Sequence, residues 1–293
     1  MGLGLKLNLV LLFVFTFGLA LFYFLSEPFL EKQAREEVLT RARIMMESAA
    51  GTRQYTAREV APLLTAQMKS TFHPQTVAAY AAMKNFEVMR TNYPDYSYRE
   101  AALNPTNPAH RAVEWEADII NDFRAFPGKR DVVTYRDTAQ GRFAHLSRPI
   151  KVEERCLVCH SRWEAAPRSL IVAYGRSNGF GWKRDEIIGA QIVSVPMALA
   201  LQHAHQTRFF FMKLLAAVFL LLAIPLNILL RAVVLNPIQR MSQIAGDVSM
   251  GKSDVPEYAK PGSDEIASLS ASFNRMRRTV EEAMKMLGES LKR

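Results

Sequence analysis

Two long runs of apolar residues set the strongest limit on how this chain can fold. Residues 7–25 contain no charged side chain, and residues 209–230 contain only Lys213. A helix of about 19 residues is about 28 Å long, close to the hydrocarbon thickness of a bilayer. Both runs are therefore predicted to be transmembrane helices. The first is interpreted as an uncleaved signal anchor, because it ends in bulky residues rather than in a small-x-small cleavage site.

The two spans divide the rest of the chain into four predicted segments: an N-terminus at 1–6, a domain at 26–208, a helical domain at 231–287 and a tail at 288–293. Two crossings place 26–208 on one side of the membrane and the other three segments on the opposite side. The positive-inside rule does not decide which side is which, because a loop this long translocates regardless of its charge.

In residues 26–208, helical patterns come first and strand-like runs follow. That order predicts an α+β domain with a small antiparallel sheet. Prolines at 94, 105 and 108 mark turn-rich connections between the helices. The predicted helices are 31–50, 57–69, 76–90 and 111–126, and the predicted strands are 131–136, 142–152, 169–174 and 190–195.

The charged residues and cysteines exclude several classes of protein. The chain carries 37 Lys and Arg against 28 Asp and Glu, a formal charge of 37 − 28 = +9. Because this excess is spread along the chain with no basic stripe, nucleic-acid binding is disfavoured. Cys156 and Cys159 are its two cysteines, which excludes a disulfide framework and a four-thiolate metal site built from this chain alone.

These cysteines form the motif Cys156-Leu157-Val158-Cys159-His160, which has the C-x-x-C-H spacing of c-type haem attachment. In that chemistry two thiols form thioethers with the porphyrin vinyl groups, and the histidine binds iron as the proximal ligand. A thioredoxin-like redox pair, half of a zinc site and inert buried thiols are the competing interpretations. The first lacks its βαβ context, and the second lacks two further ligands.

Covalent haem attachment also predicts on which side of the membrane each segment lies. In most bacteria c-type haem is attached outside the inner membrane, so residues 26–208 are expected in the periplasm and residues 231–287 in the cytoplasm. The chain is then a two-pass protein of the bacterial inner membrane, in contact with its lipids.

The sixth iron ligand is not fixed by the sequence. His73, which precedes a predicted helix, is the leading candidate for the distal ligand, and an open position accessible to a gas is the alternative. With no third cysteine, a distal thiolate is excluded. The other available side chains are His110, His145, Met45, Met46, Met68, Met83 and Met89.

Two heptad patterns follow the second span, one over 234–248 and one over 266–287, joined by a connector at 251–262. Two short amphipathic helices cannot bury their apolar stripes alone, so a four-helix bundle made by a homodimer is predicted. This spacing resembles the HAMP linker of transmembrane receptors, as do residues 236–238, 264–266 and 272–276. An ordinary membrane-proximal coiled coil is the alternative.

Residues 30–200 resemble a family of PAS-like periplasmic sensor domains that carry one c-type haem, long catalogued as a domain of unknown function. The resemblance implies a PAS-like fold and a redox-sensing or gas-sensing role. Some members of that family use a cysteine as the distal ligand, and this chain departs from them there. The stretches that carry the resemblance are 93–101, 104–108, 114–116, 148–150, 156–160, 179–182 and 189–196.

Together these features predict a dimeric, non-enzymatic receptor that senses redox state or a diatomic gas through its haem. Because no kinase, cyclase or adaptor-binding motif is visible, a separate cytoplasmic signalling partner is expected. The alternative is a membrane-anchored mono-haem cytochrome that exchanges electrons with a periplasmic partner and needs no HAMP heptads. A peroxidase would require acid–base groups at an open distal site.

Overall fold

The computed structural model describes residues 2–68, 70–250, 252 and 255–290 in two compact units, 27–207 and 1–26 with 208–293. The end of the predicted helix 57–69, the start of the predicted connector and the last three residues of the predicted tail lie outside the described residues. So do the side chains of residues 287–290.

The unit 27–207 is built on a sheet with the strand order β1-β4-β3-β2. Every neighbouring pair of strands is antiparallel, which confirms the predicted mixed domain with an antiparallel sheet. The central strands β3 and β4 are the longest, and the burial of nearly all of β4 marks it as the core strand. The strands are β1 (Ser97–Ala102), β2 (Val132–Thr138), β3 (Gly141–Lys151) and β4 (Ile187–Pro196).

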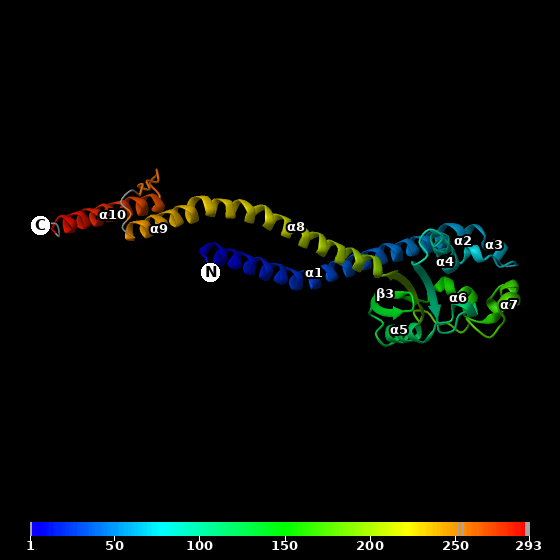
Figure 1. Cartoon of the computed structure of the whole chain (residues 1–293). Helices are drawn as coiled ribbons and strands as arrows, with labels where there is room; N and C mark the ends of the chain where they lie inside the picture. The colour runs from blue at the N-terminus through cyan, green and yellow to red at the C-terminus, as the bar shows by residue number, and fades with distance from the viewer. Residues whose placement is uncertain (1, 69, 251, 253–254, 291–293) are drawn as a thin grey trace. The chain divides into compact units, whose positions relative to one another are not determined.

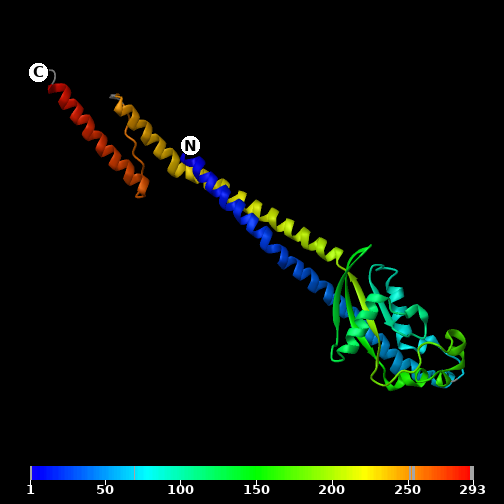
Figure 2. The same cartoon turned by 90° about the horizontal axis from the view of Figure 1, so that it is seen from below.

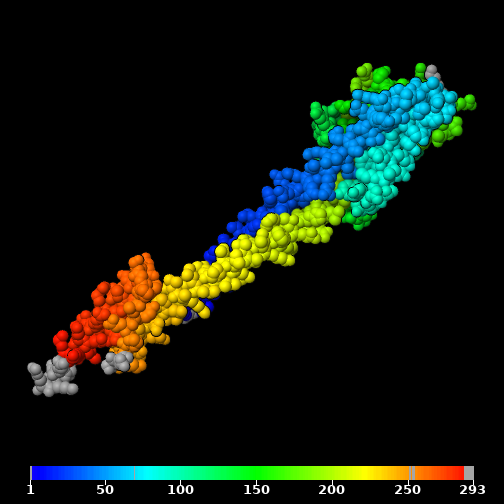
Figure 3. Space-filling view, turned by 90° about the horizontal axis from the view of Figure 1, so that it is seen from above, coloured from blue at the N-terminus to red at the C-terminus, as the bar shows by residue number. Residues whose placement is uncertain are grey.

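One face of the sheet is covered by the C-terminal half of α1 (Leu3–Tyr55) and by α4 (Ala78–Met89), and Figure 2 shows both helices beside the strands. The buried positions of α1 follow helical spacing, from Ala34 through Ala42 and Met46 to Ala49, so a single stripe meets Val193 and Val195 of β4. Figure 3 shows the light-blue end of α1 and the cyan α4–β1 segment side by side.

The opposite face is covered by α5 (Glu114–Ala125). Its side chains Ile119, Ile120 and Phe123 are buried against Ala190 and Ile192 of β4. At the start of α5, the Glu116 carboxylate accepts a 3.0 Å hydrogen bond from the backbone N–H of Val113, which satisfies a donor at the helix N-terminus. Alternate residues of β4 thus face two different helix layers, as a strand buried on both sides requires.

Shorter elements complete this unit, and two of them correct the expectations from sequence. Residues 169–174, predicted as a strand, belong to helix α7, whose N-cap is Pro167. The apolar run 170–174 is too short to distinguish a strand from a helix by its period. Strand β1 lies between the prolines at 94 and 105, a part of the chain for which no strand was predicted. The remaining elements are η1 (Thr56–Val60), α2 (Ala61–Leu63), α3 (Thr65–Met68), η2 (Pro74–Thr76), η3 (Pro108–His110), α6 (Glu154–His160), η4 (Trp163–Ala165) and α7 (Arg168–Tyr174).

The second unit contains the apolar part of α1 and most of α8 (Ala198–Leu230), the two helices long and apolar enough to cross a membrane. Phe15 and Phe219 stack between them with ring centroids 3.8 Å apart. The chain continues through η5 (Arg231–Leu235) and α9 (Asn236–Ser249) to α10 (Glu265–Ser290). Figures 1 and 2 show α9 and α10 side by side, and in Figure 2 they run in the same direction.

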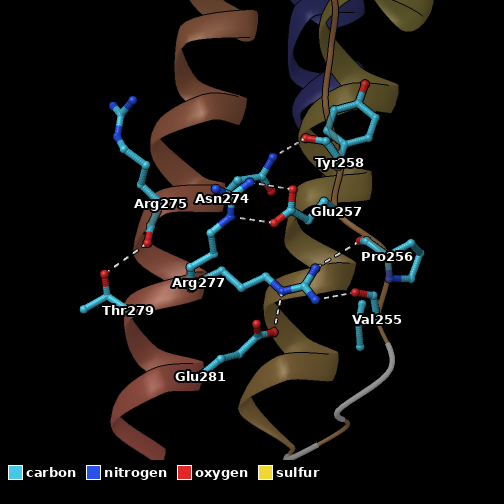
Figure 4. A network of polar contacts seen from close by, with 10 residues as sticks. Val255, Pro256, Glu257, Tyr258, Asn274, Arg275, Arg277, Thr279 and Glu281 are labelled. Carbon is cyan, nitrogen blue, oxygen red and sulfur yellow. Dashed lines mark hydrogen bonds and ion pairs between the residues drawn. The ribbon is translucent and has the colours of Figure 1, made fainter.

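The segment 255–260 is held to α10 by buried polar side chains (Figure 4). Arg277 donates to the carbonyl oxygens of Val255 and Pro256, and Asn274 donates to the carbonyl of Tyr258 at 2.9 Å. Ser270 donates to the same carbonyl of Tyr258. Apolar residues on another face of α10 are exposed: Leu269 at 50%, Met276 at 59% and Val280 at 46%.

Candidate haem-attachment site

Both cysteines lie on the short helix α6, which starts shortly after β3 ends. Cys156 and Cys159 are three residues apart on this helix, so their side chains are neighbours on its surface. Both are free thiols, and both are half-buried. The helix therefore presents two thiols side by side and accessible to a ligand, as double thioether attachment requires.

His160 is the last residue of α6, and its ring is held from three sides. Its Nδ1–H donates to the Gly179 carbonyl oxygen at 2.6 Å, and the Thr106 hydroxyl lies 3.4 Å from the same nitrogen. The Trp182 ring stacks on the imidazole with centroids 3.9 Å apart and planes 11° from parallel. A histidine whose Nδ1 donates to a carbonyl presents Nε2 as a free ligand, the usual arrangement at a metal site.

The loop that holds the ring depends on Gly179. Its φ of +80° favours glycine, and a Cβ there would lie 2.7 Å from both Cα and N of Thr106. The loop is also fixed to the end of α6, because Trp182 N–H donates to the His160 carbonyl and Gly181 N–H to that of Ser161, both at 3.2 Å. Ring orientation and loop conformation are therefore coupled.

Burial decides the protonation of these groups. It lowers the pKa of His160, against the opposing effect of the Gly179 carbonyl, so the ring is neutral near pH 7. It raises the pKa of the Cys159 thiol, and the neighbouring Cys156 raises it further. A thiol with a raised pKa is a poor redox nucleophile, which argues against a thioredoxin-like pair.

The residues present fit a covalently bound haem. Two neighbouring thiols can form the two thioethers, and the neutral, oriented imidazole of His160 can bind iron through Nε2. Among the described residues, no cluster of three or more His, Cys, Asp or Glu side chains is placed to hold a bare metal ion. A zinc site is therefore the weaker interpretation.

His73, the expected distal ligand, lies on the segment that packs against α7. Next to it, the Phe72 N–H donates to the Ser169 hydroxyl at 2.6 Å, and the Phe72 ring meets Tyr174 edge to face. The His73 side chain is partly buried. Within the described part of the chain, no hydrogen bond or ring contact joins His73 to His160, so its role as distal ligand stays a prediction.

The other candidate ligands lie elsewhere in the domain. Met46 is fully buried between α1 and the sheet, and Met45, Met83 and Met89 pack around the same core. The Met68 sulfur accepts from the N–H of His73 and the hydroxyl of Thr76. His110 ends η3. His145 alternates with the core residues Ala144 and Leu146 and faces Trp115 of α5, on the side of the sheet away from α1.

The buried His145 makes the fold sensitive to acid. Burial, with the nearby charge of Arg136, lowers its pKa to about 4. Between that value and the ordinary pKa of about 6.5 the unfolded chain binds more protons than the folded one, so stability falls as the pH falls through this range. We expect a loss of up to about 3 kcal/mol from pH 7 to pH 4.

Unfolding of the full-length protein in detergent, followed at several pH values, measures this loss. His145→Gln is the matched control, since an amide can still bond to the Ser194 hydroxyl, which lies 2.8 Å from Nδ1 in the native chain. The variant should show a weaker dependence on pH. An equal dependence in both proteins would show that His145 does not titrate as described.

Sequence reasoning identified the two cysteines and His160 but not the residues that orient the imidazole. Thr106 comes from the loop after β1, and Trp182 from the loop before β4, so both are distant from the motif in sequence. Both residues lie in stretches that carry the family resemblance, 104–108 and 179–182, and the pair of glycines around Phe180 indicates a tight backbone turn. Neither signal shows what these residues contact.

Two parts of the chain match known protein families. Residues 31–196 match the Tll0287-like family, and residues 229–282 match the HAMP domain family. A solved structure described as the cyanobacterial heme-protein Tll0287 is similar at 18% identity and a TM-score of 0.44, over 55% of this chain and 95% of that one. No curated protein matches this chain.

Proposed function

The chain belongs to the Tll0287-like family and carries a HAMP domain, and we propose that it is a transmembrane receptor whose input is a c-type haem on Cys156 and Cys159. The haem would supply an iron whose charge changes on reduction, or which binds a diatomic gas at its sixth position. The observation that carries the proposal is the imidazole of His160, fixed through Nδ1 beside two free thiols.

A short length of chain connects the loop around His160 with strand β4, which leads to helix α8. The loop that orients its ring ends at Trp182, and β4 begins five residues later at Ile187. The Asp185 N–H donates to the Val152 carbonyl at 3.0 Å, and the Val152 N–H donates to the Glu186 carbonyl at 2.9 Å, so this connection is fixed to the end of β3. We propose that a shift of the His160 ring reaches the start of β4 and the end of β3 through this connection.

A continuous helical backbone connects the sensor domain with the HAMP domain. Strand β4 ends at Pro196, and the buried Met197 leads into α8, from which helical backbone continues to Ser249 at the end of α9. Displacements of about 1–2 Å along a helix are enough to switch a packed bundle, because such bundles have discrete arrangements. The HAMP domain would receive the signal in this form.

The exposed stripe of α10 supports a homodimer. Leu269, Met276 and Val280 are apolar, share one face of the helix, and are the positions that the heptad pattern assigns to a bundle core. A second copy of the chain would bury them in a four-helix bundle. We propose the remaining features accordingly: a PAS-like sensor domain in the periplasm, two membrane crossings, a cytoplasmic HAMP domain, a separate signalling partner and no enzymatic activity.

Crosslinking of cysteines between copies with a bismaleimide, which alkylates thiols and does not depend on an oxidant, tests the receptor function. With Cys156 and Cys159 occupied by haem, Met276→Cys should crosslink readily in membranes, and Ala271→Cys, on the exposed opposite side of α10, should crosslink much less. The crosslinking efficiency of the Met276→Cys variant should differ between the oxidised and the reduced haem protein. Equal crosslinking in the oxidised, reduced and carbon monoxide-treated haem protein would instead favour a membrane-anchored electron-transfer cytochrome.

A further inference from the structure

A buried ion pair joins α1 to the sheet near the candidate haem site. Arg53 Nη1 lies 2.5 Å from both carboxylate oxygens of Glu100, and the Tyr98 hydroxyl donates to one of those oxygens at 2.7 Å. The Glu100 side chain is only 6% exposed and that of Arg53 is 22% exposed. Burying two charges costs desolvation free energy that their attraction does not always recover, so stability alone does not explain the pair.

The position of the pair connects it with the haem motif. Glu100 lies on β1, and the same chain reaches Thr106, beside the His160 ring, six residues later. The end of the sheet next to Glu100, where Ala102 pairs with Gly189 and Gly189 with Ile150, is the end from which α6 departs. Burial lowers the pKa of Arg53, but the carboxylate of Glu100 and the nearby Tyr98 outweigh it, so that pKa is raised and the guanidinium stays charged.

Arg53 also marks a change in the helix that bears it. The α-helix ends at Tyr55, and the backbone continues as a π-helix over Thr56–Val60. Such π-helical turns are rare and occur frequently at functional sites. In addition, the hydrogen bonds among the described residues engage only Nη1 of this guanidinium, which has further N–H donors on Nε and Nη2.

We propose that the Arg53–Glu100 pair is the charge contact between the haem and α1, so that it tunes the reduction potential of the iron and carries a change in iron charge to α1. This inference rests on the proposed function. It adds a second output route, because α1 is an unbroken helix from Leu3 to Tyr55 and includes the first apolar span. The signal would then reach both membrane-spanning helices rather than α8 alone.

The sign of the effect follows from the charges. Glu100→Gln removes the negative charge and leaves Arg53 cationic, since arginine does not lose its proton in proteins. An uncompensated positive charge favours the reduced iron, so the midpoint potential should rise. The double variant Arg53→Gln/Glu100→Gln has no net charge at the pair, and its potential should return close to that of the native protein.

A spectroelectrochemical titration of the haem absorption in full-length, detergent-solubilised protein measures these potentials. Glu37→Gln is the matched control, because it frees Arg41 of the same helix from its carboxylate partner at an exposed position; its potential should not change. An unchanged potential in Glu100→Gln, or a double variant that stays as high as the single one, would overturn the inference while leaving the haem receptor intact. Absence of a haem spectrum in the native protein would overturn both.

Discussion

Replacing Gly179 with alanine will destabilise the sensor domain and disturb its haem site together. The added Cβ would lie 2.7 Å from the backbone of Thr106, at a φ of +80°. We expect a cost of about 1–2 kcal/mol from the backbone conformation and a further loss of about 1–3 kcal/mol from the steric overlap. Because the Gly179 carbonyl accepts the Nδ1–H of His160, the imidazole should also lose its fixed orientation.

Gly181→Ala separates the two contributions. Gly181 has nearly the same φ, +79°, but a Cβ there meets no atom within 4 Å. Thermal unfolding of the full-length protein should therefore show a smaller loss for this variant, and its haem spectrum should resemble that of the native protein. Equal losses in the two variants would show that the close approach to Thr106 is not what requires glycine at 179.

Replacing both cysteines of α6 with serine will abolish covalent haem attachment. Serine keeps the approximate size of the side chain, so the half-buried positions on α6 should still be filled, but its hydroxyl does not form the thioether. Protein produced in a host that carries out cytochrome c maturation should then show no peroxidase-active band on a denaturing gel. This is the largest effect that we expect from any substitution in the chain.

The single variants provide the control for this experiment. Cys156→Ser and Cys159→Ser each keep one thiol, so each should retain some covalent haem with an altered absorption spectrum. Haem that survives denaturation in the double variant would contradict the assignment, because Cys156 and Cys159 are the only cysteines in the chain.

The parts of the fold that sequence could predict are those with a clear period or a strict motif. The apolar residues from Ala34 to Ala49 repeat with helical spacing, and in the structure they form the buried face of helix α1. The C-x-x-C-H spacing is a specific signal because two thiols and a histidine rarely occur at these positions by chance. By contrast, residues 170–174 are apolar without a period, and the structure shows that they belong to a helix with Pro167 as its N-cap.

Contacts between distant segments were beyond what a sequence pattern can reveal. Trp182 is an aromatic residue in a glycine-rich loop, and nothing in its neighbourhood indicates that it stacks on His160. Arg53 and Glu100 are separated by 47 residues, and each resembles an ordinary surface charge until β1 is paired with β4 and covered by α1. Sequence therefore identified the reactive groups, while the structure was needed to identify the groups that position them.

Trypsin digestion of the full-length protein tests the central claim most directly. Cleavage after Arg155 and Arg162 releases the peptide 156–162, which contains both cysteines and His160. From a host competent in cytochrome c maturation, mass spectrometry should find this peptide with the added mass of one haem and with neither thiol available to an alkylating reagent. Recovery of the peptide with two alkylated cysteines and no haem would contradict the account.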